Sequence, residues 1–320
     1  MKKLEKLDYR LPKWDMTDLQ ERHCPICGTL ENKQLYLRPD NLVVKNCGVC
    51  SVYYISPSPS PEQINQFYAQ YDSNHRKTKD LRINKSKLDL IFGTDHFGDL
   101  RIRKLASMVD FKNSSFLDVG FGIPYFLYHL QKLGGNVFGV EYDNQAIDYA
   151  RQSGLDNVFF GKISDLPKEL KFDVISMNDL IEHPLNPLDL LNEAFERLNP
   201  GGRILIWTPN GDFSKKDPNS TTFRVDLEHM QYFTTKSIAY LASKLNASIE
   251  HLECYGFPAL GDLVAPQTAM TTAMSKLKTR LKDFYPVHMA NEFKRLYLKR
   301  AYEFNNRKGS YHLFAILQKK

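Results

Sequence analysis

The sequence predicts an α/β protein: a parallel sheet with helices on both faces, a small cysteine-containing ribbon in front of it and a helical insertion before its last strand. Three observations support this prediction. Segments with strand and helix patterns alternate from residue 115 onward, a glycine turn joins the first of these strands to a helix, and two C-x-x-C motifs lie near the N-terminus. Alternating strands and helices form a sheet whose crossover helices cover both faces.

The two C-x-x-C motifs predict a metal site in the N-terminal ribbon. Each motif brings two sulfurs to one metal, and a glycine beside each motif permits the tight turn. Four thiolates suit tetrahedral zinc, and because they leave no open coordination position we expect a structural site. Iron is an alternative, since thiolates alone do not decide the metal. The predicted ligands are Cys24, Cys27, Cys47 and Cys50.

The chain divides into three predicted parts. Residues 1–60 form the four-cysteine module, residues 61–111 a linker and helical cap, and residues 112–320 the main domain, with the helical insertion at 256–308. Prolines at the junction of the first two parts predict an extended linker, which a short helix follows. Seven strands are expected in the main domain. They lie near residues 115–120, 136–141, 157–161, 172–177, 202–207, 248–254 and 311–318.

The segment Phe116–Pro124, FLDVGFGIP, predicts a ligand-binding turn between the first strand and the first helix of the main domain. Gly120 and Gly122 allow the sharp turn and the close approach of a ligand, and the proline suits the first helical position. The next strand ends in Glu141, where a carboxylate can accept both ribose hydroxyls of a nucleoside. The pattern therefore indicates a nucleoside cofactor.

The spacing D-x-G-x-G-x-P, which starts at Asp118, resembles the first motif of the class I S-adenosylmethionine (SAM) dependent methyltransferases, an acidic residue followed by G-x-G-x-G. Pro124 departs from that motif at the third glycine. The cysteine ribbon followed by a proline linker is similar to a subset of bacterial members, some of which methylate sugars carried on nucleotides. The resemblance implies a Rossmann-like seven-stranded sheet. It runs through Val140–Arg151, Asn157–Pro167, Phe172–His183, Leu198–Asn210 and Tyr311–Lys319.

The same resemblance implies a SAM site at the carboxyl ends of the strands. Gly120 and Gly122 would face the methionine part, Glu141 would bind the ribose diol, and Asn178 would meet the methionine amine. The implied cofactor residues are Asp118, Gly120, Gly122, Glu141, Tyr142, Ile163, Asn178 and Tyr71.

Two contacts of this implied cofactor site have alternatives. Lys162 stands where the family often has an acid for the adenine amino group, and because lysine cannot accept that hydrogen bond, Asp165 or Ser164 is a substitute. Tyr68 and Tyr71, in the helix after the linker, would cap SAM or serve only the packing of that helix.

Methyl transfer to a hydroxyl, or to a carbon next to a carbonyl, requires a base. His229 is the first candidate, with Glu228 to orient its imidazole and raise its basicity. His183, next to Glu182 after the fourth strand, is the second candidate, and a structural role at a helix start is its alternative. Both histidines are expected at the rim of the site.

Charge is concentrated in the insertion. Formal net charge is +6, and residues 270–308 contain ten lysines and arginines against three acids. This segment is interpreted in three ways: a solvated helical face or homodimer contact, an anion-binding lid over the acceptor, or an amphipathic helix on anionic lipid. The rest is near neutral, so general nucleic-acid binding is not expected. No apolar run reaches the about 20 residues of a membrane span, and we expect a cytoplasmic protein, with peripheral contact at the inner membrane face as an alternative.

The predicted function is methyl transfer from SAM to a small acceptor of carbohydrate or secondary metabolism, such as a nucleotide-linked or phosphorylated sugar. An RNA methyltransferase is one alternative, but the ribbon is not basic and the residues after the fourth strand, Asn178-Asp179-Leu180-Ile181, lack a D/N-P-P-Y/F tetrad. A catalytically silent SAM-binding scaffold is the other.

Overall fold

The structure is a computed structural model that describes residues 1–7, 11–69, 96, 99–213, 221–255 and 311–320. Tyr71, most of the cap predicted at 61–111 and the whole insertion predicted at 256–308 lie outside the described residues. Their predicted roles therefore stay predictions.

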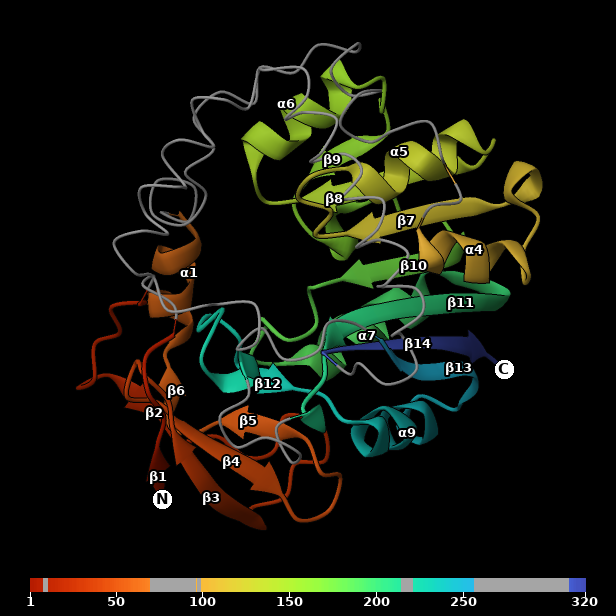
Figure 1. The fold of residues 1–320 in the computed structure, drawn as a ribbon. Coiled ribbons are helices and arrows are strands. Elements are labelled where there is room, and N and C mark those ends of the chain that lie inside the picture. Colours follow the sequence, from red (N-terminus) through yellow and green to blue (C-terminus); the bar gives the residue numbers. More distant parts are fainter. Residues whose placement is uncertain (8–10, 70–95, 97–98, 214–220, 256–310) are drawn as a thin grey trace, which may run out of the picture.

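A seven-stranded sheet forms the centre of the molecule (Figure 1), as predicted. Its strand order is β13-β14-β11-β10-β7-β8-β9. The five strands from β11 to β9 run parallel, whereas β14 is antiparallel to both of its neighbours. The carboxyl ends of β7, β8 and β10 therefore meet at one edge. The strands are β7 (Ser115–Val119), β8 (Asn136–Glu141), β9 (Val158–Phe160), β10 (Phe172–Asn178), β11 (Leu198–Pro209), β13 (Ala247–Tyr255) and β14 (His312–Lys319).

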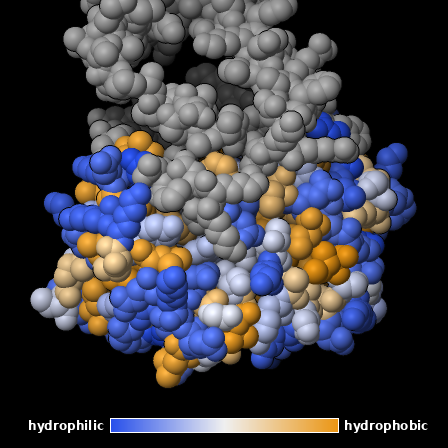
Figure 2. All heavy atoms as spheres, turned by 60° about the horizontal axis from the view of Figure 1, so that its bottom comes forward, coloured by the Kyte–Doolittle hydropathy of each residue, from blue (hydrophilic) through white to orange (hydrophobic). Residues whose placement is uncertain are grey.

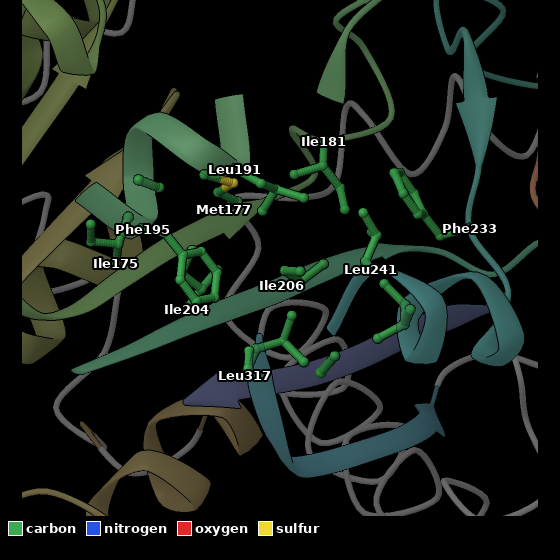
Figure 3. Close-up of a cluster of buried hydrophobic side chains, with 14 of the residues drawn as sticks. Ile175, Met177, Ile181, Leu191, Phe195, Ile204, Ile206, Phe233, Leu241 and Leu317 are labelled. Atoms are coloured by element: carbon green, nitrogen blue, oxygen red, sulfur yellow. The ribbon is translucent and has the colours of Figure 1, made fainter. Parts of the chain in front are cut away.

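Helices cover both faces of this sheet. α4 (Leu100–Ala106), α5 (Tyr125–Lys132) and α6 (Asn144–Gln152) pack on one face, and α7 (Pro187–Glu196) and α9 (Thr235–Lys244) on the other. The strands divide their side chains between the two faces by alternation. In β14, Phe314 and Ile316 pack with the first group of helices. Leu313, Ala315 and Leu317 join the second core, where Ile206, Leu241 and Leu317 lie close together in Figure 3.

Side-chain caps fix the starts of several helices. Thr234 accepts a hydrogen bond from the Ser237 backbone at 3.0 Å and caps α9, as the sequence predicts. Pro124 was expected inside the first turn of α5, but its ψ of 37° is not helical and the helix begins at Tyr125. The turn before α5 is therefore one residue longer than expected.

A second sheet contains the strands of the N-terminal module and has the order β1-β3-β4-β5-β12. Its last strand, β12 (Gln231–Tyr232), belongs to the second half of the chain and pairs antiparallel with β5. The module and the main domain thus share one sheet (Figure 1). The N-terminal strands are β1 (Lys2–Lys3), β3 (Asn32–Leu37), β4 (Val43–Cys47) and β5 (Tyr53–Ile55).

The predicted proline linker is tied down rather than free. Its β6 (Ser58–Pro59) pairs antiparallel with β2 (Leu19–Gln20), and α1 (Pro61–Ala69) follows directly. Three short 3₁₀ turns complete the described elements, at Phe111–Asn113, Ile163–Asp165 and Thr221–Phe223.

The described surface mixes polar and apolar side chains. Hydrophilic and hydrophobic residues alternate over the coloured part of the face that Figure 2 brings forward. Within the described ranges, no helix has the length and apolarity that crossing a bilayer requires.

Candidate functional site

The glycine turn after β7 has the geometry that the sequence predicts for ligand approach. Gly120 and Gly122 have φ values of 66° and 51°, in the left-handed region that favours glycine. A Cβ at Gly120 would lie 2.8 Å from Leu180 Cδ1, so a side chain there would require Leu180 to move. Glu141, at the end of β8, faces this turn and accepts a hydrogen bond from the Gly122 backbone at 2.8 Å. The carboxylate predicted for a ribose diol is thus beside the glycine turn.

Asp118 anchors the floor of this region. Its buried carboxylate accepts hydrogen bonds from Ser176 Oγ at 2.6 Å and from Asn178 Nδ2 at 3.0 Å. Burial raises the pKa of Asp118 to about 6, against the opposing effect of these hydrogen bonds. Asp118 and Asn178 were predicted separately, and the structure shows that the first orients the second.

Arg101, in α4, is a site residue that the sequence analysis missed. Its guanidinium donates to Asn178 Oδ1 at 2.7 Å, pairs with Asp99 and lies 5.1 Å from the centre of the Phe126 ring. It places a cation beside the amide predicted to meet the methionine part of SAM. Sequence offers little signal for it, because several basic residues lie close together in α4.

The residues predicted for adenine lie at the ends of β8 and β9. Ile163 is buried, whereas Tyr142 is 63% exposed, with its ring edge-on to Phe160 at 5.9 Å. Asp165 accepts a hydrogen bond from the Lys162 backbone at 2.9 Å, so its carboxylate is engaged in its own turn. The exposed ring of Tyr142 is free to lie against a planar base.

The two predicted histidines come together in the structure. The rings of His183, after β10, and His229, before β12, are 4.7 Å apart. Glu182 Oε1 lies 3.9 Å from His229 Nε2, and the nearest side-chain atoms of the three residues all lie within 4.8 Å of one another. Tyr68, at the end of α1, forms a hydrogen bond of 2.7 Å with His183 Nδ1. These four residues are called the histidine cluster below.

Burial keeps both imidazoles of the cluster neutral. It lowers the pKa of His183 to about 4, and that of His229 well below its ordinary value. Burial, together with nearby carboxylates, raises the pKa of Glu182 well above the usual range. Thr208 Oγ1 donates to Glu182 Oε2 at 2.8 Å, while the buried Oε1 has no hydrogen-bond partner among the described residues. Both imidazoles are therefore unprotonated at pH 7, and the basicity of His229 is lowered by burial and not raised as the sequence analysis predicts.

The structure changes two of the predicted assignments in this cluster. Among the described residues, Glu182 and not Glu228 is the glutamate within 4 Å of the His229 imidazole. Asp226, whose φ is 48°, accepts a hydrogen bond from the His229 backbone at 3.1 Å, so a tight turn contains Glu228 and His229. Tyr68, predicted to cap SAM or pack in its helix, hydrogen-bonds His183. The position of Glu182 next to His183 in the sequence was the feature that could have predicted its place in the cluster.

The four predicted metal ligands also come together. The Sγ atoms of Cys24 and Cys50 are 3.5 Å apart, those of Cys27 and Cys47 are 3.4 Å apart, and all four lie within 4.8 Å of one another. A zinc tetrahedron with Zn–S bonds of about 2.3 Å places its sulfurs about 3.8 Å apart. The four thiols therefore fit one tetrahedral ion.

Comparison with known proteins agrees with this architecture. Residues 95–252 match the family described as "Methyltransferase domain". The chain contains a methyltransferase domain. The ubiquinone biosynthesis O-methyltransferase of Hydrogenovibrio crunogenus is 28% identical over 130 residues, which cover 38% of this chain and 54% of that protein. The ubiquinone biosynthesis O-methyltransferase of Roseobacter denitrificans is 29% identical over 160 residues, which cover 47% of this chain and 64% of that protein.

The matched region spans about half to two thirds of these two relatives. Among solved structures, a SAM-dependent methyltransferase from Archaeoglobus fulgidus has a TM-score of 0.45 and 17% identity, covering 73% of this chain and 98% of that one. A SAM-dependent methyltransferase from Mesorhizobium loti has a TM-score of 0.44 and 15% identity, and the match covers 70% of this chain and 100% of that one.

Proposed function

We propose that the protein transfers the methyl group of SAM to a small acceptor molecule. The observation that carries the proposal is the arrangement at the end of β10. Asn178, on the cofactor side, is the last residue of β10, and His183, in the histidine cluster, follows it by five positions. A methyl donor held at Asn178 and an acceptor held at His183 would therefore be neighbours.

On the cofactor side, Glu141 would bind the ribose hydroxyls and the glycine turn would admit the methionine part without a steric clash. Asn178, oriented by Asp118, would accept a hydrogen bond from the methionine amine. Arg101 would pair with the carboxylate, because a guanidinium matches the geometry of that group.

On the acceptor side, the histidine cluster would receive a proton. SAM supplies an activated methyl group on a sulfonium. As the acceptor atom bonds to that methyl carbon and the carbon–sulfur bond breaks, the acceptor loses its proton to the imidazole of His229. His183 and Glu182 would hold that imidazole in place, and Tyr68 would fix the tautomer of His183 through Nδ1.

The acceptor class is part of the proposal. The resemblance of the ribbon and linker favours a nucleotide-linked or phosphorylated sugar. The names of the relatives instead favour O-methylation in ubiquinone biosynthesis, which is the second candidate. Both candidates present a hydroxyl that a neutral imidazole can deprotonate during transfer.

We also propose that the four cysteines hold one structural zinc ion. Three of the four sulfur ligands belong to buried residues, and Cys24, Cys47 and Cys50 are part of the hydrophobic core that α7 and α9 share. The metal would link the two C-x-x-C turns and would take no part in methyl transfer.

The test is transfer of labelled methyl from SAM into small anionic metabolites, lipids and RNA fractionated from cells. Label is expected in the metabolite fraction. His229→Asn should lower transfer by about 10²–10⁴-fold, the usual contribution of a general base, and leave SAM affinity within about twofold. The control is His251→Asn on the edge strand β13, where the imidazole hydrogen-bonds Tyr255. That variant should retain transfer.

Other distributions of label would contradict the proposal. Label in RNA would indicate the nucleic-acid alternative, and SAM binding without any transfer would indicate a silent scaffold. Full transfer by His229→Asn would exclude this histidine as the base.

A further inference from the structure

The four-cysteine module is joined to the segment that carries His229. This segment, residues 227–232, is called the histidine loop. Its end forms β12, where Gln231 pairs with Tyr54 and Tyr232 pairs with Tyr53 of the module (Figure 1). The Ile55 backbone also donates to Met230 O at 2.9 Å. The loop is therefore an edge strand of the sheet that contains the metal ligand Cys47.

A single buried arginine of the module donates three side-chain hydrogen bonds to the histidine loop. Arg38 is fully buried. Its guanidinium donates to His229 O at 2.7 Å, to Tyr232 Oη at 2.9 Å and to Leu227 O, and it holds Asp40 through two further hydrogen bonds. A guanidinium has five N–H donors, so this set of acceptors can use all of them.

The position of this guanidinium is fixed from the module side. Asp40, its buried ion-pair partner, also accepts from Trp14 Nε1 at 3.0 Å and from the Leu42 backbone at 3.4 Å. These contacts fix the position of the Asp40 carboxylate, which in turn orients the guanidinium of Arg38. The guanidinium then holds the carbonyl groups of Leu227 and His229.

The segment that carries Glu182 and His183 holds the opposite side of the histidine loop. Glu182 O accepts from the backbone of Met230 at 2.8 Å and of Gln231 at 3.2 Å. The Gln231 side chain donates to Ile181 O and Pro184 O, each at 2.7 Å. The loop is held between this segment and Arg38, and His229 projects beside His183.

We propose that Arg38 is a positioning residue that places His229 within the histidine cluster, so that the N-terminal module forms one wall of the acceptor site. Arg38 acts through the backbone of the loop and does not touch the reacting atoms. The planar fork is required, because one rigid group must reach three acceptors of the loop and a carboxylate at the same time. A lysine ammonium in the same place would be a single point donor.

A simpler interpretation is that Arg38 and Asp40 form a buried ion pair that serves stability alone. Such pairs are often replaceable by neutral groups without loss of stability, whereas removal of one partner leaves an uncompensated charge. The two interpretations predict different behaviour for a variant that removes both charges at once.

The test uses the full chain with Arg38→Met/Asp40→Asn, and with Arg38→Lys as a second variant. Lys45→Met is the matched control. Lys45 is also a buried cation of the module, but it pairs with Glu21 and Ser56 and not with the histidine loop. Histidine side chains labelled with ¹³C and ¹⁵N report the environment of His229, whose signals are assigned by their loss in His229→Asn.

In the double variant, the His229 signals should shift or broaden while the protein stays folded and its SAM affinity remains within about threefold. Arg38→Lys should give a smaller shift of the same signals, and Lys45→Met should give none. If the double variant does not fold, Arg38→Lys decides, because it keeps the charge and loses the fork.

Unchanged His229 signals in a folded Arg38 variant would overturn the proposal. Loss of SAM affinity in parallel with the shift would also overturn it, because Arg38 would then support the whole domain. These readouts need no acceptor and stand apart from the proposed function. With an acceptor in hand, we expect kcat to fall by about 10²-fold and KM for SAM to be unchanged, as for misplacement of a catalytic group by about 1 Å.

Discussion

The two sides of the candidate site are built in different ways. The local part of the cofactor side, the glycine turn after β7 and Glu141 at the end of β8, comes from one stretch of chain and is joined only by α5. Asn178 and Arg101 are added to it from β10 and α4. The histidine cluster comes from three distant segments: Tyr68 in α1, Glu182 and His183 after β10, and His229 before β12. The module adds Arg38 from a fourth segment.

This difference has consequences for how each side can fail. A local turn depends on the backbone angles of a few residues, so changes elsewhere leave it intact. A cluster of buried side chains from distant segments depends on the packing between them, so it is sensitive to changes that lie outside it. Perturbation of the module should therefore affect the histidine cluster first and the glycine turn last.

Removal of the proposed zinc ion should have the largest effect. Binding of a structural zinc ion contributes about 10 kcal/mol or more, and its loss commonly unfolds a small module. A chelator strong enough to empty the four-cysteine site should abolish methyl transfer, while SAM affinity falls by less than about tenfold. Metal content, calorimetry with SAM and transfer of labelled methyl groups would be measured on the same sample. Parallel loss of binding and transfer would show that the two sides are not separable.

Glu141→Ala should have the next largest effect, on the opposite side. Loss of charge-assisted hydrogen bonds to the ribose should cost about 2.7 kcal/mol, or about 10²-fold in SAM affinity. The control is Asp143→Asn, which keeps a side-chain cap on the adjacent α6. Calorimetry gives the affinity, and the His229 signals should stay where they are. Wild-type affinity in Glu141→Ala would remove the cofactor assignment.

The pH dependence of stability should be the smallest effect, and His183 and Asp118 should contribute to it with opposite signs. The pKa of His183 is 6.5 in the unfolded chain, and burial lowers it to about 4 in the folded protein. Stability is therefore lost as pH falls through this window. For Asp118, burial raises the pKa from 3.8 to about 6, so its cost to stability is present above pH 6 and is relieved as pH falls towards 4.

Two variants separate these contributions. His183→Asn should flatten the fall in stability between pH 7.5 and 5, and Asp118→Asn should steepen it, each by about 1–2 kcal/mol. Urea unfolding at the two pH values gives the free energies. The same slope in both variants as in the unmodified protein would mean that neither group is buried in the way the structure shows.

The sequence by itself determined the features that depend on near neighbours. The seven strands, the glycine turn at Gly120 and Gly122, and the cap at Thr234 all follow from residue type and spacing over a few positions. The two C-x-x-C motifs bring their sulfurs together as predicted, because each knuckle is a local turn. These features are fixed by the backbone angles and hydrogen bonds that each residue type permits.

Only the tertiary structure decided which carboxylate lies beside His229, which residue the hydroxyl of Tyr68 hydrogen-bonds and how the module joins the main domain. The assignment of Glu182 depends on the packing of the segment after β10 against the segment before β12. The pairing of β12 with β5 and the contacts of Arg38 join residues that are nearly two hundred positions apart. Such pairings leave no periodicity in the sequence, because they are selected by the packing of the whole molecule and not by the preferences of neighbouring residues.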